Sequence, residues 1–399
     1  MQSSTIQSAD AAIPDDAFEF IFLGTGTSSS VPEIGCLTAF EEGERTCKAC
    51  TSTLNPEGHK NIRRNTSAVF RVKGRDGKKA TVLIDVGKNF QAAALEWFPK
   101  YGLRKIDAVL ITHAHADAMN GLDDLRGWTL GGQIQSHIDI YLSSTTMDEV
   151  QRAFPYMVSK EFASGGGDVP EFKWHIISDR VPFEIEDTGI KITPFAVHHG
   201  RFFGKSPPPG NLPTPASETM SGRNSPALPL IPDTIVFNKP LSIQPYLCLG
   251  FKIEDALIYM SDVSYIPEDV WASLIPSRTG GGAPLPVFVV DCLNMHPHTS
   301  HFGLRETVAA MRRMGATRSY ITGMSHDVSH DEYEEILAAL EGRMLTAPPS
   351  SSDIVLQGRK IIGEGKSLWA RPAFDGLRLV VSPDGTVSEK TKPYRRVLF

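Results

Sequence analysis

The chain has 399 residues, of which 41% are hydrophobic and 22% are charged, a balance typical of a globular protein with a sizeable core. Its formal charge of −6 argues against general attraction to nucleic acid, although Lys60, Arg63 and Arg64 lie close together. No run of about 18 apolar residues occurs, so no membrane span is expected, and the N-terminus lacks the basic and apolar regions of a secretory signal. Five cysteines, an odd number, disfavour a disulfide framework. They favour a cytoplasmic location, without excluding the nucleus, and thiolate metal ligands.

Short runs rich in β-branched residues, bounded by polar turns, predict strands along most of the chain. In chain order they cover residues 18–24, 67–72, 80–86, 106–112, 137–143, 190–197, 246–253, 256–262, 286–293 and 319–324. Helical periodicity predicts helices over residues 88–102, 145–158, 303–315 and 331–342. This order indicates an α/β protein in which two β-sheets pack together and are covered by helices.

Three segments do not follow this pattern of buried elements. Residues 1–17 are predicted to form a disordered polar tail, which leaves 18–399 as a single domain. Residues from about 203 to 245 are dense in Pro, Ser and Gly and are predicted to form a long surface insertion. Residues 343–365, which contain APPSSSD, are predicted to form a second insertion.

The stretch ITHAHADAMNG carries potential metal ligands directly after a predicted strand. Alternation in a loop at a strand end directs His113, His115 and Asp117 toward one region, and a first-row metal needs several converging lone pairs. The alternative is three unrelated polar residues in a turn. His199 and Asp262 also follow predicted strands, although a single residue in such a place is often merely solvated.

Three of the five cysteines lie within 15 residues of sequence and include a C-x-x-C pair. Cys36, Cys47 and Cys50 are therefore predicted zinc ligands, and a redox pair is the alternative. No βαβ context of the thioredoxin type surrounds them, which favours zinc. Cys248 and Cys292 lie in predicted strands and are predicted core residues.

Several blocks of sequence resemble one known family. They are FLGTGTSSSVPEIGC, IDVGKNF, THAHADAMNGLDDLR, VHHG, YMSDVSYIPE and HFGLRE. Together they resemble the metallo-β-lactamase-fold superfamily, in particular its phosphoribosyl cyclic phosphate phosphodiesterase-like branch, over residues from about 18 to 380. The resemblance implies an αββα sandwich with metals at the rim between the two sheets. It further implies that His113, His115 and His199 bind a first metal and that Asp262 is a bridging ligand.

The second metal site of the family is incomplete in this sequence. The family places a second metal on the residue matching Asp117, on a histidine directly after it and on another late histidine. Here those two positions hold Ala118 and Gly323. The remaining carboxylates, Asp117 and Asp262, are poor zinc ligands but suit a harder ion such as Mn²⁺ or Mg²⁺. The hypothesis is one tightly held catalytic zinc with a weak or absent second ion, and loss of activity altogether is the competing hypothesis.

The resemblance also completes the thiolate site, because it points to His326 as the fourth ligand beside the three cysteines. A Cys₃His set is a closed structural zinc site, which contributes on the order of 10 kcal/mol to folding. Ten residues between Cys36 and Cys47 form an insertion relative to the family pattern, so Cys36 is the least secure of the ligands.

For the reaction, the leaving alkoxide of a phosphodiester needs a proton donor. The resemblance places a phosphate-contacting histidine at His301, which is the predicted general acid and substrate contact; a loop of solvated histidines is the alternative. Asp117 is the predicted general base. Arg64 is a predicted phosphate contact, and Arg126 with Asp123 is a predicted structural ion pair.

The leading hypothesis is therefore a metal-dependent hydrolase of a small phosphodiester, cyclic esters included. An RNA hydrolase like the tRNA 3′-end endonucleases of the same fold is an alternative, but the chain shows no basic substrate arm, so nucleic acid is not expected as a partner. The alternative from another class is a non-catalytic zinc protein that uses the fold as a binding surface. The sequence does not indicate an oligomeric state.

Overall fold

The computed structural model describes residues 13–39, 46–163, 168–202, 244–275, 283–342 and 352–392. Of the segments singled out from the sequence, 1–12, 203–243 and 343–351 lie outside these ranges. Within the described ranges, no helix combines the length and apolar character that crossing a bilayer requires.

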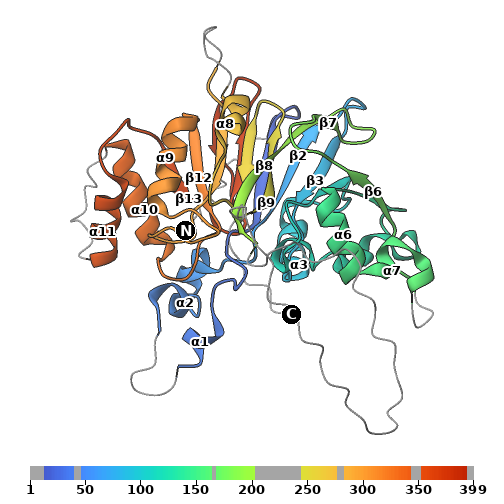
Figure 1. The fold of residues 1–399 in the computed structure, drawn as a ribbon, viewed down its shortest axis with the longest axis horizontal. Coiled ribbons are helices and arrows are strands. Elements are labelled where there is room, and N and C mark those ends of the chain that lie inside the picture. The colour runs from blue at the N-terminus through green and yellow to red at the C-terminus, as the bar shows by residue number, and fades with distance from the viewer. Residues whose placement is uncertain are drawn as a thin grey trace, which may run out of the picture.

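Two β-sheets lie face to face at the centre of the molecule (Figure 1). The first sheet consists, in spatial order, of β15 (Val387–Glu389), β14 (Arg378–Val381), β1 (Phe18–Gly24), β2 (Ser67–Lys73), β3 (Lys79–Ile84), β4 (Ala108–Leu110), β5 (Ile138–Leu142) and β6 (Phe172–Ile176). The second consists of β13 (Ala370–Pro372), β12 (Arg318–Thr322), β11 (Val287–Asp291), β10 (Leu257–Met260), β9 (Pro245–Ile253), β8 (Lys191–Arg201) and β7 (Phe183–Glu184).

Helices flank the sheets on both sides (Figure 1). They are α1 (Ile34–Leu37), α2 (Lys48–Ser52), α3 (Phe90–Tyr101), α4 (Ala116–Met119), α5 (Arg126–Thr129), α6 (Ser144–Ala153), α7 (Pro155–Val158), α8 (Glu268–Leu274), α9 (Leu304–Met314), α10 (His330–Ala338) and α11 (Asp353–Ile362). Short 3₁₀ turns cover Pro56–Asn61, Asp123–Leu125, Leu130–Gly132, Lys160–Phe162 and Ala339–Glu341.

The core is divided into three apolar layers, which follow from the alternation of side chains along the strands. One layer lies between the sheets, where Phe20 of β1 and Tyr259 of β10 approach with ring centroids 6.0 Å apart. A second joins α3, through Trp97, to the outer face of the first sheet. The third lies between the outer face of the second sheet and the helices α8, α9, α10 and α11. The predicted αββα sandwich is thereby confirmed.

One predicted helix is interrupted. The run from 145 to 158 is divided into α6 and α7 at Phe154, whose backbone has φ −135° and ψ 58°. Pro155 causes the break, because the ring of a proline disfavours the helical conformation of the residue before it.

The second predicted insertion, 343–365, contains a packed helix instead of only surface chain. Helix α11 buries Val355 and Ile362 in the layer outside the second sheet. Asp353 in its first turn and Arg359 and Lys360 in its last turn have the charges that a helix dipole favours. The sequence analysis did not predict this helix, because the Pro- and Ser-rich residues before it are typical of a loop.

The ends of the domain also differ slightly from expectation. Ala17, the last residue of the predicted tail, is fully buried at the start of β1.

Cys248 and Cys292 are buried core residues, as predicted.

Candidate metal centre

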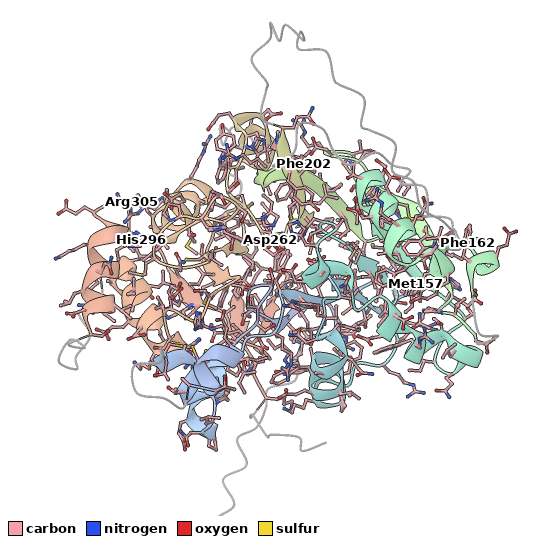
Figure 2. All side chains as sticks on the ribbon, turned by 60° about the horizontal axis from the view of Figure 1, so that its bottom comes forward. Met157, Phe162, Phe202, Asp262, His296 and Arg305 are labelled. Atoms are coloured by element: carbon pink, nitrogen blue, oxygen red, sulfur yellow. The ribbon has the colours of Figure 1, made fainter. Side chains whose placement is uncertain are left out.

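The predicted ligands come together where β4, β8 and β10 lead into loops. His113 and His115 follow β4, His199 lies near the end of β8, and Asp262 follows β10. Asp262 lies between the two helical flanks in Figure 2, with His296 and Arg305 toward the α9 side and Met157 and Phe162 toward the α7 side. The ring centroids of His113, His115 and His199 are 4.6 to 5.0 Å apart. One nitrogen of each ring lies within 4.8 Å of the others, which is close enough for the three to share an ion.

A hydrogen-bond relay behind His113 fixes the orientation of its ring. The Thr112 hydroxyl donates to Oδ2 of Asp85, so its oxygen accepts a hydrogen bond of 2.8 Å from Nδ1–H of His113. Cys248 lies on the same side, with its sulfur 3.6 Å from Nδ1. The proton on Nδ1 leaves the lone pair on Nε2, and this buried atom has no hydrogen-bond partner.

The other two imidazoles are held in similar ways. Nδ1 of His199 lies 2.8 Å from the carbonyl oxygen of Ser300, to which it donates, so the lone pair is on Nε2. That Nε2 lies 3.2 Å from Nδ1 of His115. The ring of His115 is stacked on Tyr246, with centroids 4.7 Å apart and planes 4° from parallel. Without an ion, Nδ1–H of His115 can donate to Nε2 of His199; in the other tautomer of His115, both nitrogens would offer lone pairs to one cation.

Asp262 supplies the negative charge of the cluster. It belongs to a group with His113 and to another with His199 and His301. Burial opposes its ionisation, but the adjoining imidazoles of His113, His199 and His301 outweigh burial and lower the pKa of this carboxyl. Its Oδ2 is buried without a partner. A divalent metal ion fits this donor set, because it would satisfy Nε2 of His113 and Oδ2 of Asp262 together.

Burial lowers the pKa of His113 well below the ordinary value, and burial followed by the neighbouring His199 lowers that of His115. Both rings are therefore neutral at pH 7 and keep a lone pair for a metal.

The second metal position lacks its histidines in the structure as well. Ala118 is a buried alanine in α4, and Gly323 has φ +71°. A Cβ on Gly323 would lie 2.6 Å from Oδ1 of Asp291, so a larger side chain there would displace that carboxylate. Asp117 is buried but belongs to no cluster of three ligand residues within the described ranges. Its predicted roles as a second ligand and as a base stay predictions.

His301 is paired with a carboxylate that the sequence pattern had placed inside a strand. Its Nδ1 lies 2.8 Å from Oδ2 of Asp291 and 4.0 Å from Oδ1 of Asp262. Burial alone would lower the pKa of His301, but Asp291 first and Asp262 second raise it to about 9. The imidazole is therefore protonated at neutral pH. With Nδ1 bound to Asp291, Nε2 is the nitrogen that can donate to a ligand.

The predicted substrate contact of Arg64 is not supported. Its guanidinium is bonded to Glu96 at 2.7 Å and to Asp375 at 3.4 Å, and both carboxylates are buried. Two acidic partners leave it a structural role and no free charge for a phosphate. The predicted ion pair of Arg126 with Asp123 is present.

The three cysteines and His326 form a second cluster, below the sheets in Figure 1, where α1 and α2 approach the C-terminal half. Nδ1 of His326 lies 3.3, 3.4 and 3.7 Å from the sulfurs of Cys36, Cys47 and Cys50. The sulfurs of Cys36 and Cys47 are 3.7 Å apart. With a Zn–S distance of about 2.3 Å, a tetrahedral site has S···S edges of roughly 3.8 Å, so the residues fit zinc.

No disulfide forms among the five cysteines. Burial raises the pKa of Cys36 and of Cys50, so a cation is needed to hold these thiols as thiolates at neutral pH. Cys36 was the least secure ligand from the sequence, but its sulfur lies as close to Cys47 and His326 as a shared zinc ion requires.

The loop that carries His326 is held by a buried arginine. The guanidinium of Arg63 donates to the carbonyl oxygens of Ser325 and Val328, on either side of His326, and lies over the Tyr333 ring. Nε2 of His326 faces Glu33 at 3.3 Å, the arrangement in which a carboxylate orients a metal-bound imidazole.

Asp85, Asp291 and Tyr246 lie at the histidine cluster and were not predicted to have site roles. A signal existed for Asp291, because it ends a buried strand as Asp262 follows one. Asp85 follows β3 in the structure, but the predicted strand, 80–86, included it. Tyr246 carries no such signal, since an aromatic residue in a strand is usually core.

Comparisons with known proteins place this geometry in context. Residues 80–223 match the family model of the Beta-lactamase superfamily domain. An octanoyltransferase from Porphyromonas gingivalis is 31% identical over 320 residues, which are 79% of this chain and 48% of that protein. The chain thus spans about half the length of the curated relative it matches.

Solved structures also align over most of the chain. The crystal structure of a new diphosphatase from the PhnP family aligns with a TM-score of 0.57 and 23% identity, covering 91% of this chain and 97% of that one. The metallo-beta-lactamase fold protein YhfI from Bacillus subtilis aligns with a TM-score of 0.49 and 12% identity, covering 92% and 100%.

Proposed function

The chain belongs to the metallo-β-lactamase-fold superfamily, and from this premise we propose that it is a metal-dependent hydrolase of a small phosphodiester, cyclic esters included. The observation that carries the proposal is the convergence of three imidazoles and one ionised carboxylate, with Nε2 of His113 and Oδ2 of Asp262 unpartnered inside it. Such atoms have no structural use as they stand, because burying them without a partner costs free energy.

His113, His115, His199 and Asp262 would hold the ion, most simply zinc. When bound, a divalent metal supplies Lewis acidity, which brings the pKa of a coordinated water toward neutrality and polarises a phosphoryl oxygen. The relay from Asp85 through Thr112 keeps His113 in the tautomer that binds a metal. The Ser300 carbonyl does the same for His199.

His301 is the proposed proton donor. Its imidazolium adjoins His199, with ring centroids 4.8 Å apart, so a substrate held at the metal ligands would be within reach of Nε2. An alkoxide leaving group is a strong base and takes a proton as its bond to phosphorus breaks. Asp291 holds the ring in position and keeps it charged.

A phosphorus ester is proposed in preference to a thioester or lactam for two reasons. A protonated imidazole is matched to an alkoxide that must be neutralised. In addition, one structural relative, which aligns with 91% of this chain, is a diphosphatase of the PhnP family. We also propose that Mn²⁺ or Mg²⁺ binds weakly at a second position, held by Asp117 and Asp262. The proposed partner is a small phosphodiester, and the proposed location is the cytoplasm.

The test combines elemental analysis with turnover of bis(p-nitrophenyl) phosphate. We expect two zinc ions per wild-type chain and one in His113→Ala, with a fall in kcat/KM of at least about 1,000-fold, since loss of the metal removes its whole contribution to the transition state. His59→Gln, at a histidine that bonds the carbonyl oxygen of Pro56 and belongs to neither ligand cluster, is the control and keeps both values.

Unchanged metal content and activity in His113→Ala would refute the catalytic proposal. A wild-type chain that carries both ions and turns over no phosphodiester, with zinc or with added Mn²⁺, would instead support the non-catalytic binding protein.

A further inference from the structure

A third cluster of ligand-type side chains lies at the open edge of the sandwich, away from both sites described above. Strand β6 ends the first sheet and β7 ends the second, at the same side of the molecule (Figure 1). Asp139 on β5 and His175 on β6 belong to the first sheet. Glu186 lies in the turn between β7 and β8, in the second sheet. One ligand atom from each of these three residues lies within 4.8 Å of the other two.

From this arrangement we propose that Asp139, His175 and Glu186 form a binding site for a first-row divalent cation that links the edges of the two sheets. Nε2 of His175 is 2.7 Å from Oδ1 of Asp139 and 3.8 Å from Oε2 of Glu186. Ligands of one such ion, each about 2.0–2.2 Å from it, lie roughly 3 to 4.4 Å apart. The separation of His175 from Glu186 lies inside this range, and that from Asp139 is slightly below it. One imidazole and two carboxylates are a donor set that Zn²⁺ and Mn²⁺ accept.

The imidazole is held in place before any ion arrives. The ring of His175 is stacked on Tyr141, with centroids 4.4 Å apart and planes 11° from parallel, and Phe183 covers the Tyr141 ring at 4.9 Å. The Tyr141 hydroxyl also accepts a hydrogen bond of 2.9 Å from the backbone N–H of Glu186. One tyrosine therefore orients a ligand from each sheet, which reduces the entropy that binding would cost.

The charges around the cluster favour a cation. Asp139, Glu186 and Asp187 lie close enough to Tyr141 to add to the effect of burial on its hydroxyl, whose pKa rises to about 12. Lys173 is a cationic neighbour, with its Nζ 3.7 Å from Oε2 of Glu186. Nε2 of His137 lies 3.7 Å from the other oxygen of Asp139 and places a second imidazole beside the site. The side chains of Asp139 and Glu186 thus bring two carboxylates to the cluster, which favours a cation.

An ordinary ion pair between His175 and Asp139 is the competing explanation, and the two differ in metal stoichiometry. The experiment uses the full-length protein with both other sites loaded, dialysed against increasing Zn²⁺ or Mn²⁺ and analysed for bound metal. We expect the wild type to bind one more ion per chain than His175→Gln or Glu186→Gln, and His298→Gln to match the wild type. We also expect added ion to raise the Tm of the wild type more than that of either variant.

Glu186 is half exposed, so Glu186→Gln is expected to fold even where His175→Gln does not, and it then decides the question alone. Equal metal content in the wild type and in folded Glu186→Gln at every concentration would overturn the proposal. The same applies if the Tm of the variants falls equally with and without added ion, because that result means an ion pair only.

Discussion

Replacing Asp291 by asparagine tests whether the carboxylate beside His301 sets its protonation. Asp291 contacts Nδ1 of His301 directly at 2.8 Å, whereas Asp262 is 4.0 Å away. Together they raise the pKa of this imidazole from an ordinary 6.5 to about 9, against the effect of burial. The direct contact has the larger effect, so its loss should lower the pKa by about one to two units, or roughly 1.4 to 2.7 kcal/mol.

The assay is the pH dependence of kcat on a phosphodiester. A general acid acts only while protonated, so activity of the wild type should fall as the pH rises through the pKa of His301. We expect this alkaline limb to lie about one to two pH units lower in Asp291→Asn. Asp269→Asn, which changes an exposed carboxylate paired with Arg180, should leave the limb in place. A uniform loss of kcat at every pH, with the limb unmoved, would show that Asp291 does not control the proton on His301.

The same shift predicts a stability effect with a defined sign. The folded-state pKa of His301 lies above its unfolded value, so the protonated ring stabilises the folded chain fully below pH 6.5, and this stabilisation disappears as the pH rises through about 9. The free energy of unfolding lost in Asp291→Asn should therefore be larger at pH 6 than at pH 10, as measured by urea denaturation.

The other predictions concern the two sites separately. Cys50→Ser should remove one zinc per chain, as checked by elemental analysis. It should also lower the free energy of unfolding by several kcal/mol in urea denaturation, because a structural zinc site contributes its binding free energy to folding. Gly323→Ala should cost about 1–3 kcal/mol and lower kcat, because its Cβ would lie 2.6 Å from Asp291 at φ +71°. Gly342→Ala, at φ +72° with open space around the Cβ, should cost stability without affecting kcat. Ala118→His alone should bind no additional ion in a metal titration, since Gly323 still supplies no ligand.

The layers of the fold were predictable because each central strand has its own signal. FEFIFLG and PVFVVDCL are runs of mainly apolar residues, interrupted only by Glu19 and Asp291, and β1 and β11 are buried along their whole length. Strand β6 was missed because FKWHI is a half-exposed edge strand, in which Lys173 and His175 interrupt the apolar pattern. Edge strands need only one neighbour, so their composition is weakly constrained.

The ligands were predictable to the extent that each lies at a strand end with a side chain of the right kind. His113, His199 and Asp262 meet that description singly. Their convergence required the topology, which the family resemblance supplied. Asp291 was missed because the predicted strand, 286–293, continued past it, whereas β11 ends at this residue. Arg64 was misjudged because its partners, Glu96 and Asp375, lie 32 and 311 residues further along the chain.

The sequence separations of the ligands have a consequence for how the protein is made. His115 and His199 are 84 residues apart, and Cys36 and His326 are 290 residues apart. Chain segments so distant meet only when β10 and β12 have joined their sheet, since closing long loops is entropically costly and is repaid by packing. A nascent or truncated polypeptide that ends before Asp262 has neither set of ligands complete, and one that ends before His326 lacks the histidine of the thiolate cluster. The thiolate cluster can therefore be completed only after most of the chain has been made.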